Sequence, residues 1–320
     1  MTDARNAGAT TRRHRWSVLL RLGITALILV LIFRSIEINS VLQVMRRASL
    51  PLLGLAVVFQ LISTLLAGFR WYLVMHRLGF GQATPFYIKS YFKGSFFNQG
   101  LPTSIGGDAI RVLDVAATGC RKRDAFRGVF IDRILGLVGL LLLNLLANAL
   151  LPDLLPRDLF LLLNLIVLGG VSGFCALIFV HHLRWFNRWR LPRYLLGISS
   201  QLHSIMYGFR NSALQLTLSV LIHLFSMINI FLIGRSVGLD YDLVTFTVIV
   251  PPVILLTLIP ISLAGWGVRE GAMIGLFTLL GADKSVILSM SILYGIILVI
   301  ASLPGLVVYL SGRQHRTQPH

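Results

Sequence analysis

The chain alternates long hydrophobic runs with short polar segments that hold most of its charged residues. A helix rises about 1.5 Å per residue, so roughly 20 apolar residues cross the hydrocarbon core of a bilayer. The uncharged runs near or above this length are 51–69, 134–152, 159–180, 211–234, 243–268 and 285–312. A weaker run, 16–33, contains Arg21, whose long side chain can reach the lipid headgroups. The pattern predicts an all-helical protein with several membrane spans.

Two segments do not fit ordinary spans, because glycine and proline interrupt them. Residues 84–107 carry two lysines and end in NQGLPTSIGG, and residues 260–281 begin with PISLAGWG. Irregular backbone inside a membrane is tolerated only where protein or a water-filled cavity surrounds it. We therefore expect each segment to form a re-entrant hairpin, in which one helix enters the membrane, breaks and returns as a second helix.

Composition supports a membrane protein. It argues against nucleic-acid binding, which a strongly basic chain would otherwise suggest. Hydrophobic residues make up 56% of the 320 residues and charged residues only 13%, and the mean hydropathy is +0.80. Lysine and arginine exceed the acids by 17, but they gather in loops, as they do on the cytoplasmic side of membrane proteins. We expect membrane lipids as partners, no nucleic acid, and a bacterial inner membrane location. The two cysteines, Cys120 and Cys175, fit neither a metal site nor a disulfide framework.

The basic segments predict the orientation of the chain. They are 12–15, 111–127, 181–193 and 313–316, and we place all four, with both termini, in the cytoplasm. Segment 34–50 holds three arginines on the opposite side and disobeys this rule. Residues 184–210 combine aromatic residues with arginines, which favours a helix on the membrane surface, although a plain basic linker fits as well. The predicted organisation is a basic tail (1–15), one transmembrane domain (16–312) and a short tail (313–320).

A short sequence occurs twice. PTSIGGDAIR begins at position 102 and PISLAGWGVR at position 260, an offset of 158 residues, and four of the ten positions are identical. The same offset carries the run 51–69 onto 209–227 and the run 134–152 onto 292–310. A local coincidence would not extend to whole elements. The chain therefore divides into two repeated halves, about 51–152 and 209–310, with a linker (153–208) that holds a helix and a basic surface segment.

The number of crossings between the two halves predicts that the halves are inverted. If the N-terminus is cytoplasmic, the first hairpin enters the membrane from the inside and the second from the outside. Such inverted repeats are typical of secondary transporters, in which broken helices meet near the midplane at the substrate site. The predicted fold is thus about six full transmembrane helices plus two re-entrant hairpins.

Charged residues follow each break. Asp108 and Arg111 are three residues apart, so they share one face of a helix and can pair, which lowers the cost of burying either charge. Arg111 and Arg269 occupy the same position of the repeat and can offer a cationic fork to a phosphate or another anionic headgroup. Free N–H groups at the helix start would assist them. The alternative is that each arginine only reaches toward the nearer membrane surface.

Other polar residues near the breaks leave two interpretations open. Glu270 directly follows Arg269, and neighbours in a helix point apart, so we expect Glu270 to contact another element. Asp132 and Arg133 open a span, either as anchors of the helix start or as part of the first hairpin's site. Asn98 can bind a headgroup or satisfy backbone groups that the break leaves free.

We predict a single substrate-binding or translocation site with no catalytic residue, no metal and no cofactor. Its candidate residues are Asn98, Pro102, Ser104, Gly106, Gly107, Asp108, Arg111, Asp132, Arg133, Pro260, Ser262, Gly265, Gly267, Arg269 and Glu270. Further polar residues inside spans are expected to form hydrogen bonds between helices. These are Asn144, Asn148, Asn164, His223 and Asn229.

Sequence motifs for enzymatic activity are weak. DYD at 240–242 has the D-x-D shape of sites that bind metal-nucleotide sugars, but Asp242 precedes a predicted helix and can serve as its N-cap. The sequence contains no Walker A motif, no H-E-x-x-H and no nucleophile elbow. We therefore do not expect ATP-driven pumping by this chain alone.

The two breaks and their surroundings resemble a known family. FFNQGLPTSIGGDAIRV followed by DRILGL, and PISLAGWGVREGAM followed by LG, are similar to the lysylphosphatidylglycerol synthase transmembrane region, also called the flippase-like (UPF0104) family. The resemblance covers roughly residues 20–310 and implies lipid binding or translocation by the motif residues. Bifunctional members carry a soluble aminoacyl-transferase domain; this chain ends a few residues after its last run, so we expect it to lack that activity.

Three functions are consistent with the sequence. The leading hypothesis is a lipid transporter of flippase or scramblase type that moves a phospholipid or a lipid-linked anionic headgroup. The second is an integral-membrane transferase, or an accessory subunit of one, in glycolipid or polyprenol-linked biosynthesis, which would need acids clustered at one membrane face. The third is a non-transporting partner of lipid biosynthesis enzymes.

Overall fold

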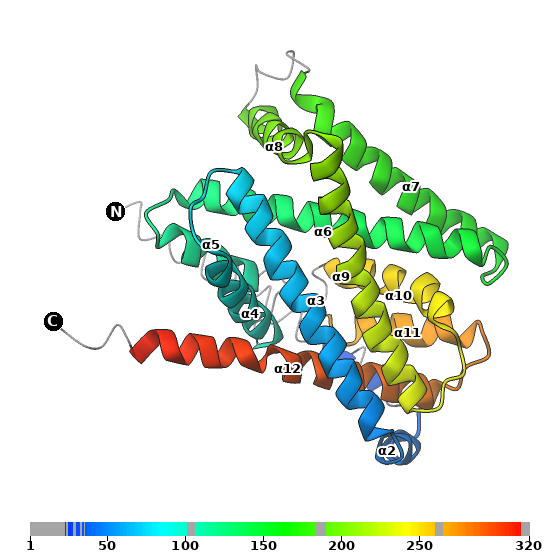
Figure 1. Cartoon of the computed structure of the whole chain (residues 1–320). Coiled ribbons are helices and arrows are strands. Elements are labelled where there is room, and N and C mark those ends of the chain that lie inside the picture. The colour runs from blue at the N-terminus through cyan, green and yellow to red at the C-terminus, as the bar shows by residue number, and fades with distance from the viewer. Residues whose placement is uncertain are drawn as a thin grey trace, which may run out of the picture.

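The structure is a computed structural model that describes residues 23, 25–27, 30–32, 34, 36–100, 106–182, 190–259 and 265–314. All regular elements within these residues are helical, which confirms the predicted fold class (Figure 1). In chain order they are α2 (Ile38–Arg46), α3 (Leu50–Arg77), α4 (Thr84–Gly100), α5 (Gly106–Ala116), α6 (Lys122–Leu150), α7 (Arg157–Phe179), the short 3-10 helix η1 (Val180–His182), α8 (Arg190–Met206), α9 (Phe209–Ser236), α10 (Leu243–Leu258), α11 (Val268–Thr278) and α12 (Lys284–Gln314).

Five helices are long and apolar enough to cross a membrane: α3, α6, α7 continued by η1, α9 and α12. They match five of the seven hydrophobic runs; an additional run, 16–33, lies largely outside the described residues. The apolar run 243–268 is not one continuous helix. Helix α10 ends after 16 residues at Leu258, and Ile259 is extended, as a residue that precedes a proline prefers to be.

Helices α3 and α9 cross in antiparallel directions near the centre of the molecule (Figure 1). The Asn229 side chain donates a hydrogen bond to Gln60 (2.7 Å), the Ser63 hydroxyl lies 3.1 Å from that of Ser226, and Arg70 donates to Ser219. Residue numbers rise along one helix as they fall along the other. The two helices have the same length, 28 residues, and start 159 residues apart, so equivalent helices of the two halves run in opposite directions.

Contacts between other helices are also related by the repeat, because a helix contact made by one half has an equivalent made by the other half. Helix α4 lies against α12, and its counterpart α10 lies against α6; α3 contacts α12, and α9 contacts α6. The spacing between equivalent elements is not constant, however. Helices α5 and α11, like α6 and α12, start 162 residues apart, because the second break is four residues longer. The predicted offset of 158 therefore holds within one residue only up to the breaks.

The first hairpin is held together by glycines. Gly94 of α4 and Gly107 of α5 face each other so closely that a Cβ on either would collide with the carbonyl oxygen of the other. On another side of α4, Gly305 of α12 lies against the backbone of Phe92 in the same manner. Helices α4 and α5 thus lie side by side, as expected for a hairpin, and α12 packs directly on α4.

Helix α10 contains two adjacent prolines, and a neighbouring span compensates for them. Pro251 and Pro252 have no N–H, so the carbonyl groups of Thr247 and Val248 lose their partners within the helix. The side-chain amide of Asn144, on α6, donates to both of these carbonyls, at 2.9 and 3.0 Å. This contact confirms the predicted interhelical role of Asn144 and fixes α10 against α6.

The other intramembrane polar residues also form hydrogen bonds between helices, as predicted. The Asn148 side chain donates to Asn164 of α7 (3.4 Å), besides Asn144 of its own helix (3.3 Å). A ring nitrogen of His223, on α9, lies 2.8 Å from the carbonyl oxygen of Gly136, on α6. Asp242 is the N-cap of α10 and accepts from the Thr245 N–H at 2.7 Å, which supports the structural reading of the DYD sequence.

Candidate functional site

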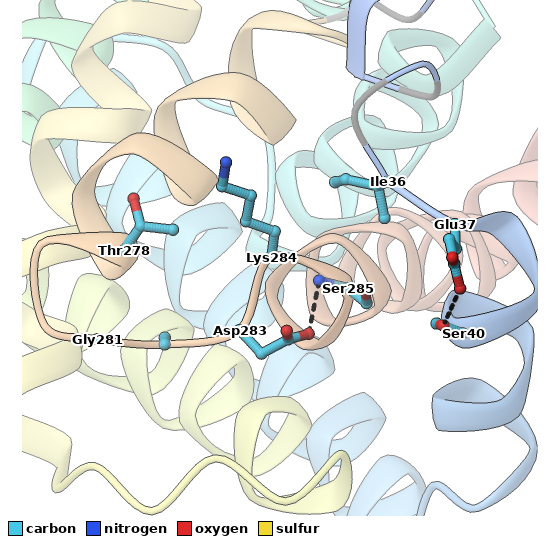
Figure 2. Close-up of a pocket in the computed structure, with 9 residues that line it drawn as sticks. Ile36, Glu37, Ser40, Thr278, Gly281, Asp283, Lys284 and Ser285 are labelled. Carbon is cyan, nitrogen blue, oxygen red and sulfur yellow. Dashed lines mark hydrogen bonds between the residues drawn. The ribbon is translucent and has the colours of Figure 1, made fainter.

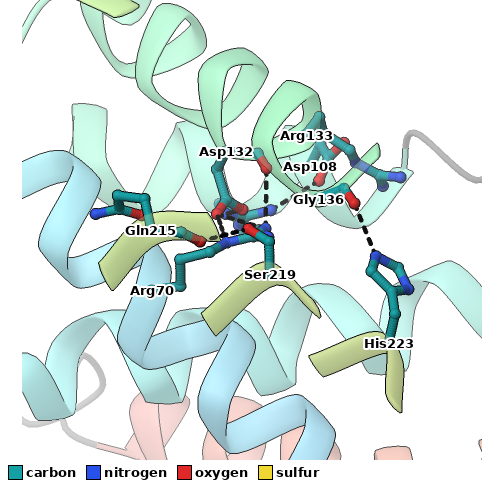
Figure 3. Close-up of polar contacts among 9 residues, drawn as sticks. Arg70, Asp108, Asp132, Arg133, Gly136, Gln215, Ser219 and His223 are labelled. Carbon is teal, nitrogen blue, oxygen red and sulfur yellow. Dashed lines mark hydrogen bonds and ion pairs between the residues drawn. The ribbon is translucent and has the colours of Figure 1, made fainter. Parts of the chain in front are cut away.

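A buried carboxylate links three helices of the first half. Asp132 on α6 accepts from the Arg70 guanidinium of α3 at 2.9 Å (Figure 3). Its other carboxylate oxygen accepts from Arg111 of α5 at 2.6 Å. Arg70 also donates to the Asp132 carbonyl and to Ser219 of α9. All three charged side chains are almost completely buried. Removing one partner from such a group leaves a buried charge uncompensated, which typically costs about 3–5 kcal/mol.

Arg111 is further fixed by aromatic side chains. Its guanidinium carbon lies 4.1 Å from the Trp71 ring centre and 4.5 Å from that of Tyr91. A guanidinium over an aromatic face gains about 0.5–2 kcal/mol, with the larger values where water is excluded. The predicted ion pair with Asp108 is present at 3.2 Å. Arg111 is therefore buried in protein, rather than reaching toward the membrane surface.

The most exposed part of the cluster is the pair of Asp108 and Arg133. Arg133 donates to the second oxygen of Asp108 at 2.6 Å (Figure 3), and its side chain is 38% exposed, compared with 4% for Arg111. The pair Asp132 and Arg133 thus belongs to the first hairpin's surroundings, which was one of the two interpretations of the sequence. Together with Arg70, the five side chains bring three guanidinium groups and two carboxylates together.

The start of α5 explains the local sequence. Gly107 has no room for a side chain against α4, and its N–H donates to the Asn98 side chain at 2.7 Å. Helix starts leave N–H groups without partners in the helix. Asn98 therefore satisfies the backbone at the break, the second of its two predicted roles.

The second half contains a smaller cluster built on the same residue types. Arg269 donates to Glu270 at 2.6 Å and to Ser291 of α12 at 3.2 Å. Its guanidinium carbon lies 4.7 Å from the Trp266 ring centre and 5.4 Å from that of Tyr294. As in the first half, an arginine is held between two aromatic rings and a carboxylate.

Glu270 does contact another element, as expected, because the Ser291 hydroxyl of α12 donates to it at 3.2 Å. The expectation that it points away from Arg269 is wrong. Glu270 is the third residue of α11, and its second oxygen accepts from the Gly267 N–H at 2.6 Å. This capping interaction turns the side chain back over the helix start, where Arg269 reaches it. Gly265 and Gly267 both have φ of +83°, a conformation that other residues rarely adopt.

Four candidate residues lie outside the described part of the chain: Pro102, Ser104, Pro260 and Ser262. Gly106 is the first residue of α5. The remaining candidates divide into the two clusters above, one in each half, and the structure places neither next to the other: within the described residues, no hydrogen bond or ion pair joins them. Helix α12, which carries Ser291 and Tyr294 of the second cluster, packs against α4 and α3 of the first half and so links the two clusters indirectly.

Sequence reasoning missed Arg70 and the four aromatic partners. Arg70 ends the uncharged run 51–69 and resembles an ordinary boundary residue, yet it lies seven residues before the end of α3. The available signal was that Arg70 is a charge within a helix that continues past this residue, since intramembrane charges require partners. The aromatic residues gave no signal, because tryptophan and tyrosine are common in spans.

The fold and the two clusters define the chain as a multi-pass helical membrane protein with buried, paired charges at two matched breaks. Residues 18–305 match the sequence model of the family described as the lysylphosphatidylglycerol synthase TM region. The chain belongs to this family, which confirms the resemblance noted from its motifs. No curated protein matches the chain.

Proposed function

We propose that the protein is a lipid transporter of flippase or scramblase type, which moves a phospholipid or a lipid-linked anionic headgroup across the bacterial inner membrane. The observation that carries the proposal is the matched pair of arginine clusters at the breaks of two antiparallel halves. Broken helices related by an inverted repeat form the substrate site in many transporters. Both termini are cytoplasmic in this proposal.

The clusters suggest how a headgroup is bound. Each guanidinium already has a carboxylate partner, so a headgroup phosphate binds by replacing that carboxylate. In the first half the exchange takes place at Arg133, which is the most exposed member of its cluster and contacts Asp108. Phosphate offers guanidinium the same two-oxygen geometry as a carboxylate. The acyl chains remain in the lipid while the headgroup passes.

A translocation assay tests the proposal. Vesicles of phosphatidylethanolamine and phosphatidylglycerol with the reconstituted protein would contain a trace of fluorescent phosphatidylglycerol, and dithionite would quench the outer leaflet. We expect wild-type protein to expose inner-leaflet lipid, and Arg133→Gln to slow this about tenfold, the effect of losing roughly one charge-assisted hydrogen bond. Arg235→Ala, which removes an exposed arginine paired with Asp240 outside both clusters, is the matched control.

The deeper variant is Arg111→Ala combined with Arg269→Ala. Because this variant removes buried partners and can unfold the protein, size-exclusion chromatography and thermal unfolding accompany it. A folded double variant, or Arg133→Gln, that moves lipid at the wild-type rate would contradict the proposed role of the clusters.

A further inference from the structure

A polar pocket lies where α11 turns into α12, away from both arginine clusters. Its volume is about 570 Å³, within the range of small-molecule sites. The start of α2 provides Glu37 and Ser40, and the segment from α11 to α12 provides Thr278, Asp283, Lys284 and Ser285 (Figure 2).

Most polar groups of the pocket already have partners, but the ammonium of Lys284 does not. Asp283 caps α12 by accepting from the N–H groups of Ser285 (2.8 Å) and Val286 (3.1 Å). Glu37 accepts from the Ser40 hydroxyl at 3.4 Å and stays exposed. Within the described residues, Lys284 forms no hydrogen bond or ion pair, although two carboxylates line the same pocket. Its amine is thus available to a ligand.

The position of Lys284 is unfavourable for the helix itself. It is the first residue of α12, and a cation near a helix N-terminus costs about 0.3–1 kcal/mol. The same arrangement occurs in the first half, where Lys122 is the first residue of α6. Each lysine follows, by three positions, a glycine with positive φ, Gly119 or Gly281. Both halves therefore keep a lysine at a position that helix stability does not favour.

Exposed apolar side chains adjoin the pocket residues along the chain. Ile38 follows Glu37 and Leu279 follows Thr278, and the two side chains are 54% and 51% exposed. A polar pocket beside exposed apolar side chains suits an amphiphile better than a soluble anion, because these side chains can contact acyl chains.

We propose that this pocket binds a phospholipid headgroup, with the phosphate against Lys284 and a terminal hydroxyl or ammonium group against Glu37. A headgroup with both features places its phosphate at the cation and its hydrogen-bond donor at the carboxylate, and leaves the capping role of Asp283 unchanged. The inference extends the proposed function by naming the two headgroup groups that the pocket binds, but binding at this pocket does not itself require translocation.

Equilibrium binding to the purified full-length protein in detergent tests the inference. The probes are dihexanoyl phosphatidylglycerol, phosphatidylethanolamine and phosphatidylcholine, with glycerol 1-phosphate as the free phosphate, each followed by isothermal titration calorimetry. We expect phosphatidylglycerol and phosphatidylethanolamine to bind more tightly than phosphatidylcholine, whose terminal group donates no hydrogen bond. Lys284→Ala should weaken binding of all three lipids about tenfold, since a charge-assisted contact is lost.

Glu37→Ala should remove the preference over phosphatidylcholine while phosphatidylcholine binding stays unchanged. Both side chains are exposed, so neither variant threatens folding. Arg157→Ala, at the exposed first residue of α7, is the matched control and should bind like wild type. Wild-type affinities in Lys284→Ala would overturn the assignment, and so would glycerol 1-phosphate binding as tightly as phosphatidylglycerol.

The results separate the two proposals. If Lys284→Ala loses lipid binding while the wild-type protein moves no lipid in vesicles, the pocket stands and the transport proposal fails. If the wild-type protein moves lipid but Lys284→Ala binds normally, transport stands and the pocket assignment fails.

Discussion

Asp132 is the residue on which the first cluster depends, because its carboxylate pairs with both Arg70 and Arg111. Replacing it with asparagine preserves the shape but leaves Arg70 and Arg111 facing each other without a buried carboxylate. We expect Asp132→Asn to destabilise the protein by about 3–5 kcal/mol, the usual cost of breaking a buried ion pair. The measurement is the midpoint of thermal unfolding in detergent, compared with Asp124→Asn, which changes an exposed acid near the start of the same helix.

A combined replacement separates stability from function at these residues. Arg70→Met, Arg111→Met and Asp132→Leu together remove every charge of the buried group, and such apolar replacements are often neutral or stabilising. We expect this triple variant to regain most of the lost stability. If it also moved lipid at the wild-type rate, the buried charges would have a structural role only.

The contacts of the buried charged residues could be predicted from the sequence only in part. The pair of Asp108 and Arg111 was predictable because both residues lie on one helix and a helix fixes their spacing. The partners Asp132 and Arg70 are 62 residues apart, and only the packing of α3 on α6 brings them together. Glu270 was misjudged because the rule for neighbouring residues describes the middle of a helix, whereas Glu270 caps its start.

At the scale of elements, α10 depends on its neighbour for two backbone hydrogen bonds. We expect Asn144→Ala to destabilise the protein, because two carbonyls then lack a donor and each buried loss costs about 1–3 kcal/mol. In a background with Pro251→Ala and Pro252→Ala, the restored N–H groups can bond the same carbonyls within the helix. The cost of Asn144→Ala should then largely disappear.

The comparison is a double-mutant cycle measured by thermal unfolding. Asn229→Ala is a suitable control, since the Asn229 amide donates to Gln60 at the crossing of α3 and α9 and should cost the same in both backgrounds. An equal cost of Asn144→Ala with and without the prolines would show that its amide does not compensate for them.

The elements themselves were largely predictable, and their exact relation was not. Uncharged runs gave the five described spans because a membrane requires continuous apolar helices of a fixed minimum length. The glycine- and proline-rich breaks marked the hairpins for the same reason. The four-residue shift between the halves was not visible, because the two copies of the repeated sequence match without a gap although they differ in structure. Helix α5 begins at Gly106, the fifth residue of its copy, whereas α11 begins only at Val268, the ninth residue of the other copy. The division into repeat halves and a linker remains a prediction.

At the scale of the whole molecule, an inverted repeat predicts on which side of the membrane each turn lies. This prediction can be tested without knowing the substrate. The antiparallel crossing of α3 and α9, and the exchange of helix contacts between the halves, both require equivalent turns to face opposite sides of the membrane. Cys120, in the turn between α5 and α6, and Ala282, between α11 and α12, are such equivalent positions at the spacing of 162 residues.

We expect these two positions to react with a membrane-impermeant maleimide from opposite sides. One variant keeps Cys120 and carries Cys175→Ser; the other adds Cys120→Ser and Ala282→Cys. In inside-out vesicles Cys120 should react and position 282 should not, and in right-side-out vesicles the reverse should hold. Detergent should make both reactive, which controls for accessibility. Labelling of both positions from one side would mean that the halves are parallel, and two hairpins entering from the same face could not form the symmetric pathway that the transport proposal requires.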